Sequence, residues 1–358
     1  MDERIFSFKI GSPVPVWDAA HQLPIKGSVG PEIGDSATIF RINSTYMEVT
    51  DQPHMIRHWL AGGALMSFLS VILFLSVGIN VFHFHPPTHG DVADILMVAI
   101  LTLTPVIFSV MAFHFGKNEF FSLTRKPIRF NRRTKKIYAI RKRAWKLSGC
   151  ACDIFSEVSW DNTSIFCVHQ GPEKFDLQNC YHIRCYQVDL KGNVTNAFAI
   201  GREWHGTDGM RELLAQWNYW CLFMNEGPER LPKPLIYLSE RERLSDSFLY
   251  CLYGLGFNLP KIFRIILTPF VFILTAHRVI ALWTCRQPIW AGSVLKDCYL
   301  DPADVHDQPK GETPVGWAET VRARREGRYP RASTYEAVGW GGLADAYKNA
   351  KQWQGMKI

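Results

Sequence analysis

Two long uncharged apolar stretches interrupt the pattern of hydrophobic and polar positions along the chain. Residues 60–82 contain no Asp, Glu, Lys or Arg over 23 positions, and residues 95–113 contain none over 19. A helix rises about 1.5 Å per residue and the hydrocarbon core of a bilayer is about 30 Å thick, so each stretch predicts a transmembrane helix. Pro86, Pro87 and Gly90 lie in the short connection between them, and we therefore expect a helical hairpin.

After residue 117 the pattern changes to short alternating segments that are typical of strands. Residues 126–141 predict a β-hairpin with its turn at 131–134, and further strands are predicted at 154–158, 164–169, 182–190 and 196–200. Over residues 210–224 the apolar positions recur at helical spacing, and Gly227 and Pro228 end that helix. The predicted fold class is an α+β membrane protein, in which a transmembrane helical hairpin joins a cytoplasmic antiparallel β domain closed by a helix, in a pleckstrin-homology-like arrangement.

A third apolar region, residues 248–283, is interrupted by charge and leaves two interpretations open. One is an amphipathic helix over residues 261–286, bent at Pro269, that lies in the membrane interface or packs against the hairpin. Its narrow polar arc would contain Lys261, Arg264, Thr268, Thr275, Arg278 and Arg286. The other is a re-entrant pair formed by residues 248–259 and 265–283.

These patterns divide the chain into five predicted segments. They are an N-terminal cytoplasmic segment (1–58), a transmembrane hairpin (59–116), a cytoplasmic β-rich domain with its closing helix (117–246), a membrane-associated apolar or amphipathic segment (247–300) and a polar C-terminal tail (301–358).

The charge of the chain is distributed unevenly. The net charge is +7, but residues 117–146 hold twelve Lys and Arg against one Glu, a local net of +11, so the rest of the chain is net negative. Because this block follows the second apolar stretch directly, the positive-inside rule places the N-terminus and everything after residue 116 in the cytoplasm. The same position makes nucleic acid an improbable partner and leaves membrane lipids as the expected one.

The block also defines a candidate site for lipid headgroups, with a pure topology signal as the alternative interpretation. Its members are Arg125, Lys126, Arg129, Arg132, Arg133, Lys135, Lys136, Arg141, Lys142 and Arg143.

Motifs for catalysis or metal binding are missing from the sequence. There is no G-x-S-x-G elbow, P-loop, H-E-x-x-H or dinucleotide-binding glycine pattern, and the nine scattered cysteines include no C-x2-C pair. We therefore expect a protein that is not an enzyme and uses no cofactor, with no catalytic, cofactor-binding or metal-binding residues.

Two stretches carry a family resemblance. The run KPIRFNRRTKKIYAIR after the hairpin and the run LLAQWNYWCLFMNEGPERLP from Leu213 to Pro232 resemble an uncharacterised family of proteobacterial inner-membrane proteins, over roughly residues 59–301. Members of that family tend to be encoded beside type VI secretion effectors. The resemblance implies a multi-pass protein of the bacterial inner membrane that acts as an immunity or accessory factor, with a cognate toxin or effector as its partner. The alternative function is a membrane-anchored lipid-sensing or scaffold module.

Overall fold

The structure is a computed structural model that describes residues 10–30, 32–50, 57–84, 92–141, 154–171, 180–232, 234, 237–255, 260–309 and 333–334. The chain folds into two compact units. Unit 1 contains residues 1–54, 125–241 and 288–358, and unit 2 contains residues 55–124 and 242–287. The protein is a mixed α+β protein with antiparallel sheets, and its described residues include two apolar helices that could span a membrane, as the sequence predicts.

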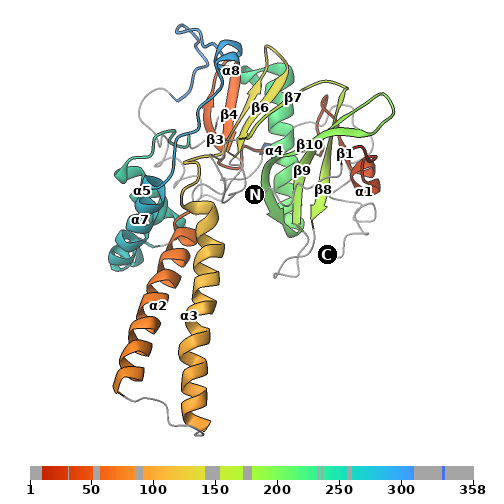
Figure 1. Ribbon diagram of the computed structural model, residues 1–358. Coiled ribbons are helices and arrows are strands. Elements are labelled where there is room, and N and C mark those ends of the chain that lie inside the picture. The colour runs from red at the N-terminus through yellow and green to blue at the C-terminus, as the bar shows by residue number, and fades with distance from the viewer. Residues whose placement is uncertain are drawn as a thin grey trace. The chain divides into compact units, whose positions relative to one another are not determined.

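Unit 1 is built on two antiparallel sheets (Figure 1). The five-stranded sheet has the order β3-β4-β5-β6-β7, formed by Ile39–Ile42, Tyr46–Thr50, Pro127–Asn131, Lys136–Arg141 and Ile154–Ser159. The four-stranded sheet has the order β1-β8-β9-β10, formed by Gln22–Leu23, Ser164–Gly171, Cys180–Val188 and Val194–His205. The strands predicted after residue 126 are all present, and the predicted hairpin forms with its turn at residues 132–135.

Short elements complete unit 1. They are the helices α1 (Val16–Ala20) and α8 (Gly292–Asp297), the 3-10 helix η3 (Pro228–Arg230), and the paired strands β2 (Glu32–Ile33) and β11 (Ser333–Thr334).

Strands β3 and β4 come from the predicted N-terminal segment, and the sequence analysis did not find them. β4 pairs with β5 in the register Tyr46↔Asn131 to Thr50↔Pro127, so the two long helices are inserted between neighbouring strands of one sheet. The C-terminal end of the predicted membrane-associated segment also belongs to unit 1, because Trp290 packs on Arg129 of β5. The units therefore differ from the five segments because long-range pairing joins residues that are distant in sequence.

Helix α4 (Gly206–Glu226) provides the apolar residues that fill the core between the sheets. Trp217 and Trp220 are fully buried, and their rings lie 5.2 Å from Trp160 and 4.8 Å from Phe130, respectively. The helix ends at Gly227, whose φ of 101° is open to glycine at little cost and whose N–H donates to two carbonyls of the last turn. The closing helix predicted from apolar residues at helical spacing is therefore confirmed.

The five-stranded sheet is buried on both faces at β4 and β5. Ile128 and Phe130 of β5 point into the core, whereas Arg129 and Asn131 point to the other face. There Trp290 and the end of α8 cover them: Asn131 Nδ2 donates to the carbonyl of Asp297 at 2.8 Å. This outer face is polar and yet covered, so alternation along the strands does not show which side meets solvent.

Unit 2 consists of helices: α2 (Arg57–Phe84), α3 (Val92–Glu119), α5 (Leu244–Gly254), α6 (Lys261–Ile266) and α7 (Thr268–Trp283). α2 and α3 run side by side, and α7 packs against both α2 and α5 (Figure 1). The predicted amphipathic helix is present as α6 and α7, but it breaks at Leu267 and not at Pro269. Pro269 lies in the first turn of α7, where a missing N–H costs no hydrogen bond.

Candidate functional site

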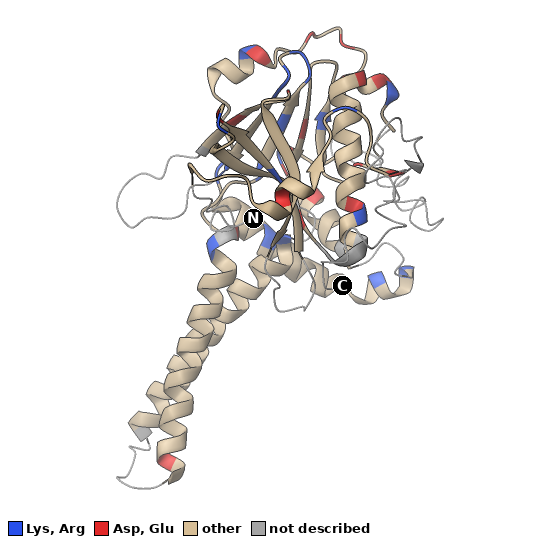
Figure 2. Cartoon of the chain, turned by 90° about the vertical axis from the view of Figure 1, so that its right-hand side faces the viewer, with Lys and Arg blue, Asp and Glu red and all other residues tan. Residues whose placement is uncertain are grey.

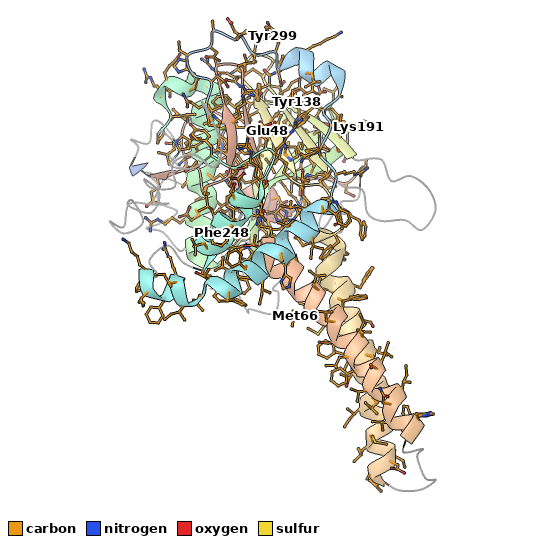
Figure 3. All side chains as sticks on the ribbon, turned by 90° about the vertical axis from the view of Figure 1, so that its left-hand side faces the viewer. Glu48, Met66, Tyr138, Lys191, Phe248 and Tyr299 are labelled. Atoms are coloured by element: carbon orange, nitrogen blue, oxygen red, sulfur yellow. The ribbon has the colours of Figure 1, made fainter. Side chains whose placement is uncertain are left out.

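Helices α2 and α3 expose large apolar side chains along most of their length. Each helix contains a long apolar window, of which only 11% of the residues in α2 and 6% in α3 are buried. Large apolar side chains such as Leu73 and Ile107 are more than half exposed, and so is Met66, which Figure 3 labels. A core helix of a soluble protein buries its apolar residues, whereas these helices present theirs outward. Charged residues lie only near the helix ends (Figure 2).

The small residues at the start of α2 allow close contact with two neighbouring helices. A Cβ atom on Gly63 would lie 3.6 Å from the ring of Phe115 in α3, and Gly116 of α3 lies against Ala64. A Cβ on Gly62 would lie 2.8 Å from His277 Nδ1 of α7, so any side chain there would require the His277 ring to shift. These glycines therefore allow close approach of two neighbouring helices, α3 and α7.

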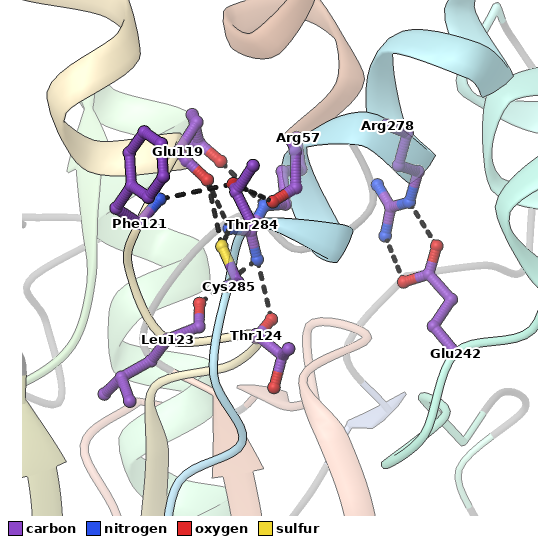
Figure 4. A network of polar contacts seen from close by, with 10 residues as sticks. Arg57, Glu119, Phe121, Leu123, Thr124, Glu242, Arg278, Thr284 and Cys285 are labelled. Atoms are coloured by element: carbon purple, nitrogen blue, oxygen red, sulfur yellow. Dashed lines mark hydrogen bonds and ion pairs between the residues drawn. The ribbon is translucent and has the colours of Figure 1, made fainter.

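A buried ion pair closes the hairpin where α2 begins and α3 ends (Figure 4). Arg57 Nε lies 2.8 Å from Glu119 Oε2, and Arg57 Nη1 donates to the carbonyl of Thr124 at 2.7 Å. Cys285 Sγ donates to the carbonyl of Glu119 at 3.1 Å. Arg57 is 3% exposed, and its guanidinium pairs with groups of unit 2. The side chain therefore flanks the apolar stretch and also holds the start of α2 to the end of α3 and the residues that follow it.

The predicted basic site is divided by the fold, and its buried members pair with unit 1 itself. Glu48 is fully buried and accepts from Arg125 Nε at 3.1 Å and from Arg129 Nε at 2.6 Å. Arg129 also stacks on Tyr46 and Trp290, and Arg141 donates to the carbonyl of Ala199 in β10. The three arginines are 7%, 8% and 8% exposed, so their guanidinium groups are covered by the protein.

The turn between β5 and β6 places three further cations at the ends of helices. Arg132 Nη2 donates to the carbonyl of Glu226 at 3.2 Å, and Lys135 Nζ donates to that of Met224, both in the last turn of α4. Arg133 Nη2 donates to the carbonyl of Asp297 at 3.0 Å, at the end of α8. Helix C-termini leave carbonyls without intrahelical partners and carry partial negative charge. These side chains therefore stabilise two helix ends.

The remaining members of the predicted site do not assemble into one face. Lys136 forms an ion pair with Glu157 of β7 at 2.7 Å, with both side chains partly exposed. Lys126 is half-buried just before β5. Lys142 and Arg143 lie outside the described residues. Within the part of the chain that the structure describes, the basic residues thus do not converge on a common ligand.

A polar cluster beneath α1 was not found by the sequence analysis. The carboxylate of Asp18 is fully buried and lies 2.8 Å from His169 Nδ1, and it accepts a hydrogen bond from the Tyr186 hydroxyl at 2.5 Å. Arg184 Nη1 approaches the same hydroxyl at 3.3 Å. Burial, and then the contact with Asp18, raise the pKa of Tyr186, although Arg184 opposes the shift. The cluster fixes α1 on β8 and β9, and the described residues contain no group of three or more His, Cys, Asp or Glu that could hold a metal ion.

Comparison with known protein families assigns the chain to one family. Residues 105–302, more than half of its 358 residues, match a family described as a family of unknown function, DUF6708. The chain belongs to DUF6708. The DUF6708 region begins within α3 and extends through β5 to β10, α4 and α8. No curated protein and no solved structure matches the chain significantly.

Proposed function

We propose that this DUF6708 protein is a non-enzymatic binding protein anchored in the bacterial inner membrane by α2 and α3. The observation that carries the proposal is the outward exposure of apolar side chains along two helices of 28 residues each. At about 1.5 Å per residue each helix is roughly 42 Å long, enough to cross a hydrocarbon core of about 30 Å. A bilayer is the solvent in which such a surface is stable.

The sheet of unit 1 supports a hairpin topology independently of charge. Because Thr50 pairs with Pro127, the chain must return after α3 to the place that it left before α2. Two crossings satisfy this condition and a single crossing does not. Lys and Arg act on orientation while the chain is being inserted, before β4 and β5 pair, so their later burial leaves the topology signal intact. We therefore place unit 1 in the cytoplasm.

The arrangement of unit 1 supports binding as its role. A meander of five strands, a second antiparallel sheet and one closing helix together form the layout of a pleckstrin-homology-like domain, which we propose as its fold. Binding residues lie disproportionately on loops that a rigid scaffold positions, and both sheets of unit 1 supply such a scaffold. The two quoted sequence runs lie in β5 to β6 and at the end of α4 with η3. Their resemblance to proteins encoded beside type VI effectors supports a role as an immunity or accessory factor.

A reporter map tests the anchor. Alkaline phosphatase is active only outside the cytoplasm and green fluorescent protein folds only inside, so each is fused after residue 87 and after residue 150. We expect phosphatase activity at residue 87 and fluorescence at residue 150. Fluorescence at both sites, together with release of the protein by alkaline carbonate, would refute the membrane anchor.

The proposed partner is tested with the full chain. Detergent-solubilised protein is expected to retain the effector encoded beside it, and cells that lack the gene are expected to die when the effector is produced. Survival of such cells would rule out immunity. The lipid-sensing alternative predicts that Arg133→Glu with Lys135→Glu reduces the anionic lipid recovered with the protein, relative to Lys191→Glu in the exposed β9–β10 turn. Equal recovery from the two variants would rule that alternative out.

A further inference from the structure

We propose that α6 and α7 form an in-plane segment whose apolar face lies in the cytoplasmic interface of the same bilayer. The inference rests on the proposed membrane anchor and concerns a different surface of unit 2. It commits to one occupant, the boundary between lipid headgroups and acyl chains. Three observations carry it: the direction of the side chains, the pairing of the charge on α7 and the level at which α7 meets the hairpin.

Large apolar side chains occupy the outward face of α7, in addition to Val271 and Leu274, which are buried on its inward face. Phe272, Ile273 and Trp283 are 60%, 52% and 86% exposed, whereas Thr275 and Arg278 are 3% and 0% exposed. A helix on the surface of a soluble protein has charged and polar residues on its outward face instead. The exposed apolar surface continues along α6, through Ile262, Phe263, Ile265 and Ile266. A continuous apolar face of this kind marks an interaction site, and beside two helices of membrane-spanning length it is suited to lipid.

The one charged residue of α7 is paired inside the unit. Arg278 forms a two-pronged ion pair with Glu242, in which Nη2 donates to Oε2 at 2.8 Å (Figure 4). Its guanidinium also lies 4.8 Å from the ring centre of Tyr250 in α5. With the cation paired and covered, the outward face of α7 carries no charge. Burial of that face in acyl chains therefore leaves no ion to desolvate.

The contacts with the hairpin set the depth of α7. Phe270 meets Trp59, His277 meets Gly62, and Cys285, just after α7, meets Glu119 at the end of α3. Along α2 the first two contacts lie three residues apart, about 4.5 Å, although they are seven residues apart on α7, about 10 Å. α7 therefore crosses α2 near its first turns and does not run along it. It stays at the level where the hydrocarbon core begins, and its 16 residues, about 24 Å, are too short to cross the core.

This geometry distinguishes between the two interpretations of the third apolar region. A re-entrant pair formed by residues 248–259 and 265–283 would carry the start of α7 toward the centre of the bilayer, away from the start of α2. The contact between Phe270 and Trp59 holds the start of α7 beside the start of α2 instead. We therefore assign an interfacial position in which the apolar face lies on the acyl chains and the Arg278–Glu242 pair lies on the protein side.

Photolabelling of the full-length protein in phosphatidylcholine vesicles tests the inference. One lipid carries a diazirine beside the glycerol backbone and a second carries it at the end of the acyl chain, and labelled residues are mapped by mass spectrometry. We expect the shallow probe to label Phe272, Ile273 and Trp283 at least fivefold more than the deep probe does. Leu73 in the middle of α2 should show the reverse preference, and neither probe should label Leu190 of unit 1.

Each other outcome has a defined meaning. Labelling of α2 without α7 overturns the inference and leaves the anchor standing. Preferential labelling of α7 by the deep probe overturns the interfacial position in favour of a re-entrant one. If the inward residues Val271 and Leu274 are labelled as strongly as the outward residues Phe272 and Ile273, the assignment of the outward face of α7 to lipid is overturned. Absence of label from α2 contradicts the proposed membrane anchor itself, so failure of the anchor and failure of the inference are distinguishable.

Discussion

Replacement of Glu48 with glutamine should destabilise unit 1 through two arginines at once. The Glu48 carboxylate is fully buried, and it is the common ion-pair partner of Arg125 and Arg129. Their side chains are only 9% and 10% exposed, so water cannot replace the missing carboxylate. The substitution keeps the size of the side chain and one acceptor oxygen but removes the negative charge. Its effect therefore reports the ion pairs and not a cavity.

The expected magnitude follows from the burial of the three groups. Breaking a buried ion pair by removing one partner typically costs 3–5 kcal/mol, because the other charge stays buried without compensation. The remaining Glu240 carboxylate lies 3.7 Å from Arg125 and is itself 41% exposed, so it offsets only a small part. We expect a loss of about 3–5 kcal/mol in the free energy of unfolding of unit 1.

Glu157→Gln is the matched control within the same sheet. Glu157 also pairs across neighbouring strands, with Lys136 at 2.7 Å, but the two side chains are 43% and 38% exposed. Exposed pairs contribute about 0–1 kcal/mol. Urea unfolding of the detergent-solubilised chain, followed by tryptophan fluorescence of the core, compares the two variants. A loss for Glu48→Gln within about 1 kcal/mol of the control would refute the reasoning.

A double variant tests the shared ion-pair cluster directly. Glu48→Gln with Arg125→Gln removes one cation together with the carboxylate, so it leaves a single uncompensated arginine. It should cost less than the sum of the two single losses, with a coupling of about 0.5–3 kcal/mol. Strict additivity would contradict a shared ion-pair cluster.

Three further predictions concern local packing and pH. Gly62→Val places a side chain against His277, where a Cβ alone would approach to 2.8 Å, so α7 should separate from α2 and tryptic cleavage within α6 should accelerate. Gly201→Ala combines a φ of +77° with a Cβ contact of 2.8 Å to Trp220, and urea unfolding should show a loss of about 2–4 kcal/mol. Burial raises the pKa of Asp35 from 3.8 to about 6, so unit 1 should lose stability as pH rises from about 4 to about 6, and Asp35→Asn should flatten that slope in urea titrations.

Two matched glycines control the packing effects, and the Asp35 variant is judged by its pH slope. Gly63→Ala meets nothing closer than 3.6 Å and should leave cleavage nearly unchanged. Gly192→Ala has a φ of +80° but open space around it, so it should lose only the backbone part, about 1–2 kcal/mol. Equal effects at Gly201 and Gly192 would exclude the contact with Trp220 as a cause. For Asp35, an unchanged pH slope in the variant would assign that slope to other groups.

Local sequence patterns predicted the elements whose signals are local. Uncharged length identified α2 and α3, and helical spacing with Gly227 and Pro228 identified α4 and its end. The pairing of β4 with β5 could not be found in this way, because the partner of Thr50 is Pro127, on the other side of the hairpin. Hydrogen bonds between strands leave no mark within either segment.

The basic segment shows a second limit of local patterns. Charge density alone suggested one patch, whereas the direction of each side chain depends on groups that are distant in sequence. Arg125 and Arg129 form ion pairs with Glu48, and Arg132 donates a hydrogen bond to a carbonyl at the end of α4. The two-residue period of a strand separates Arg129 from Phe130, but it does not show that Trp290 will cover the arginine face.

The interruption of the five-stranded sheet by α2 and α3 makes biogenesis sequential. During synthesis β3 and β4 leave the ribosome first, the two apolar helices follow, and β5, the partner of β4, emerges only afterwards. Until then β4 has an open edge that other chains can pair with. Closure of the sheet therefore waits until both helices have been synthesised, and if α2 and α3 enter a bilayer as proposed, their insertion precedes that closure.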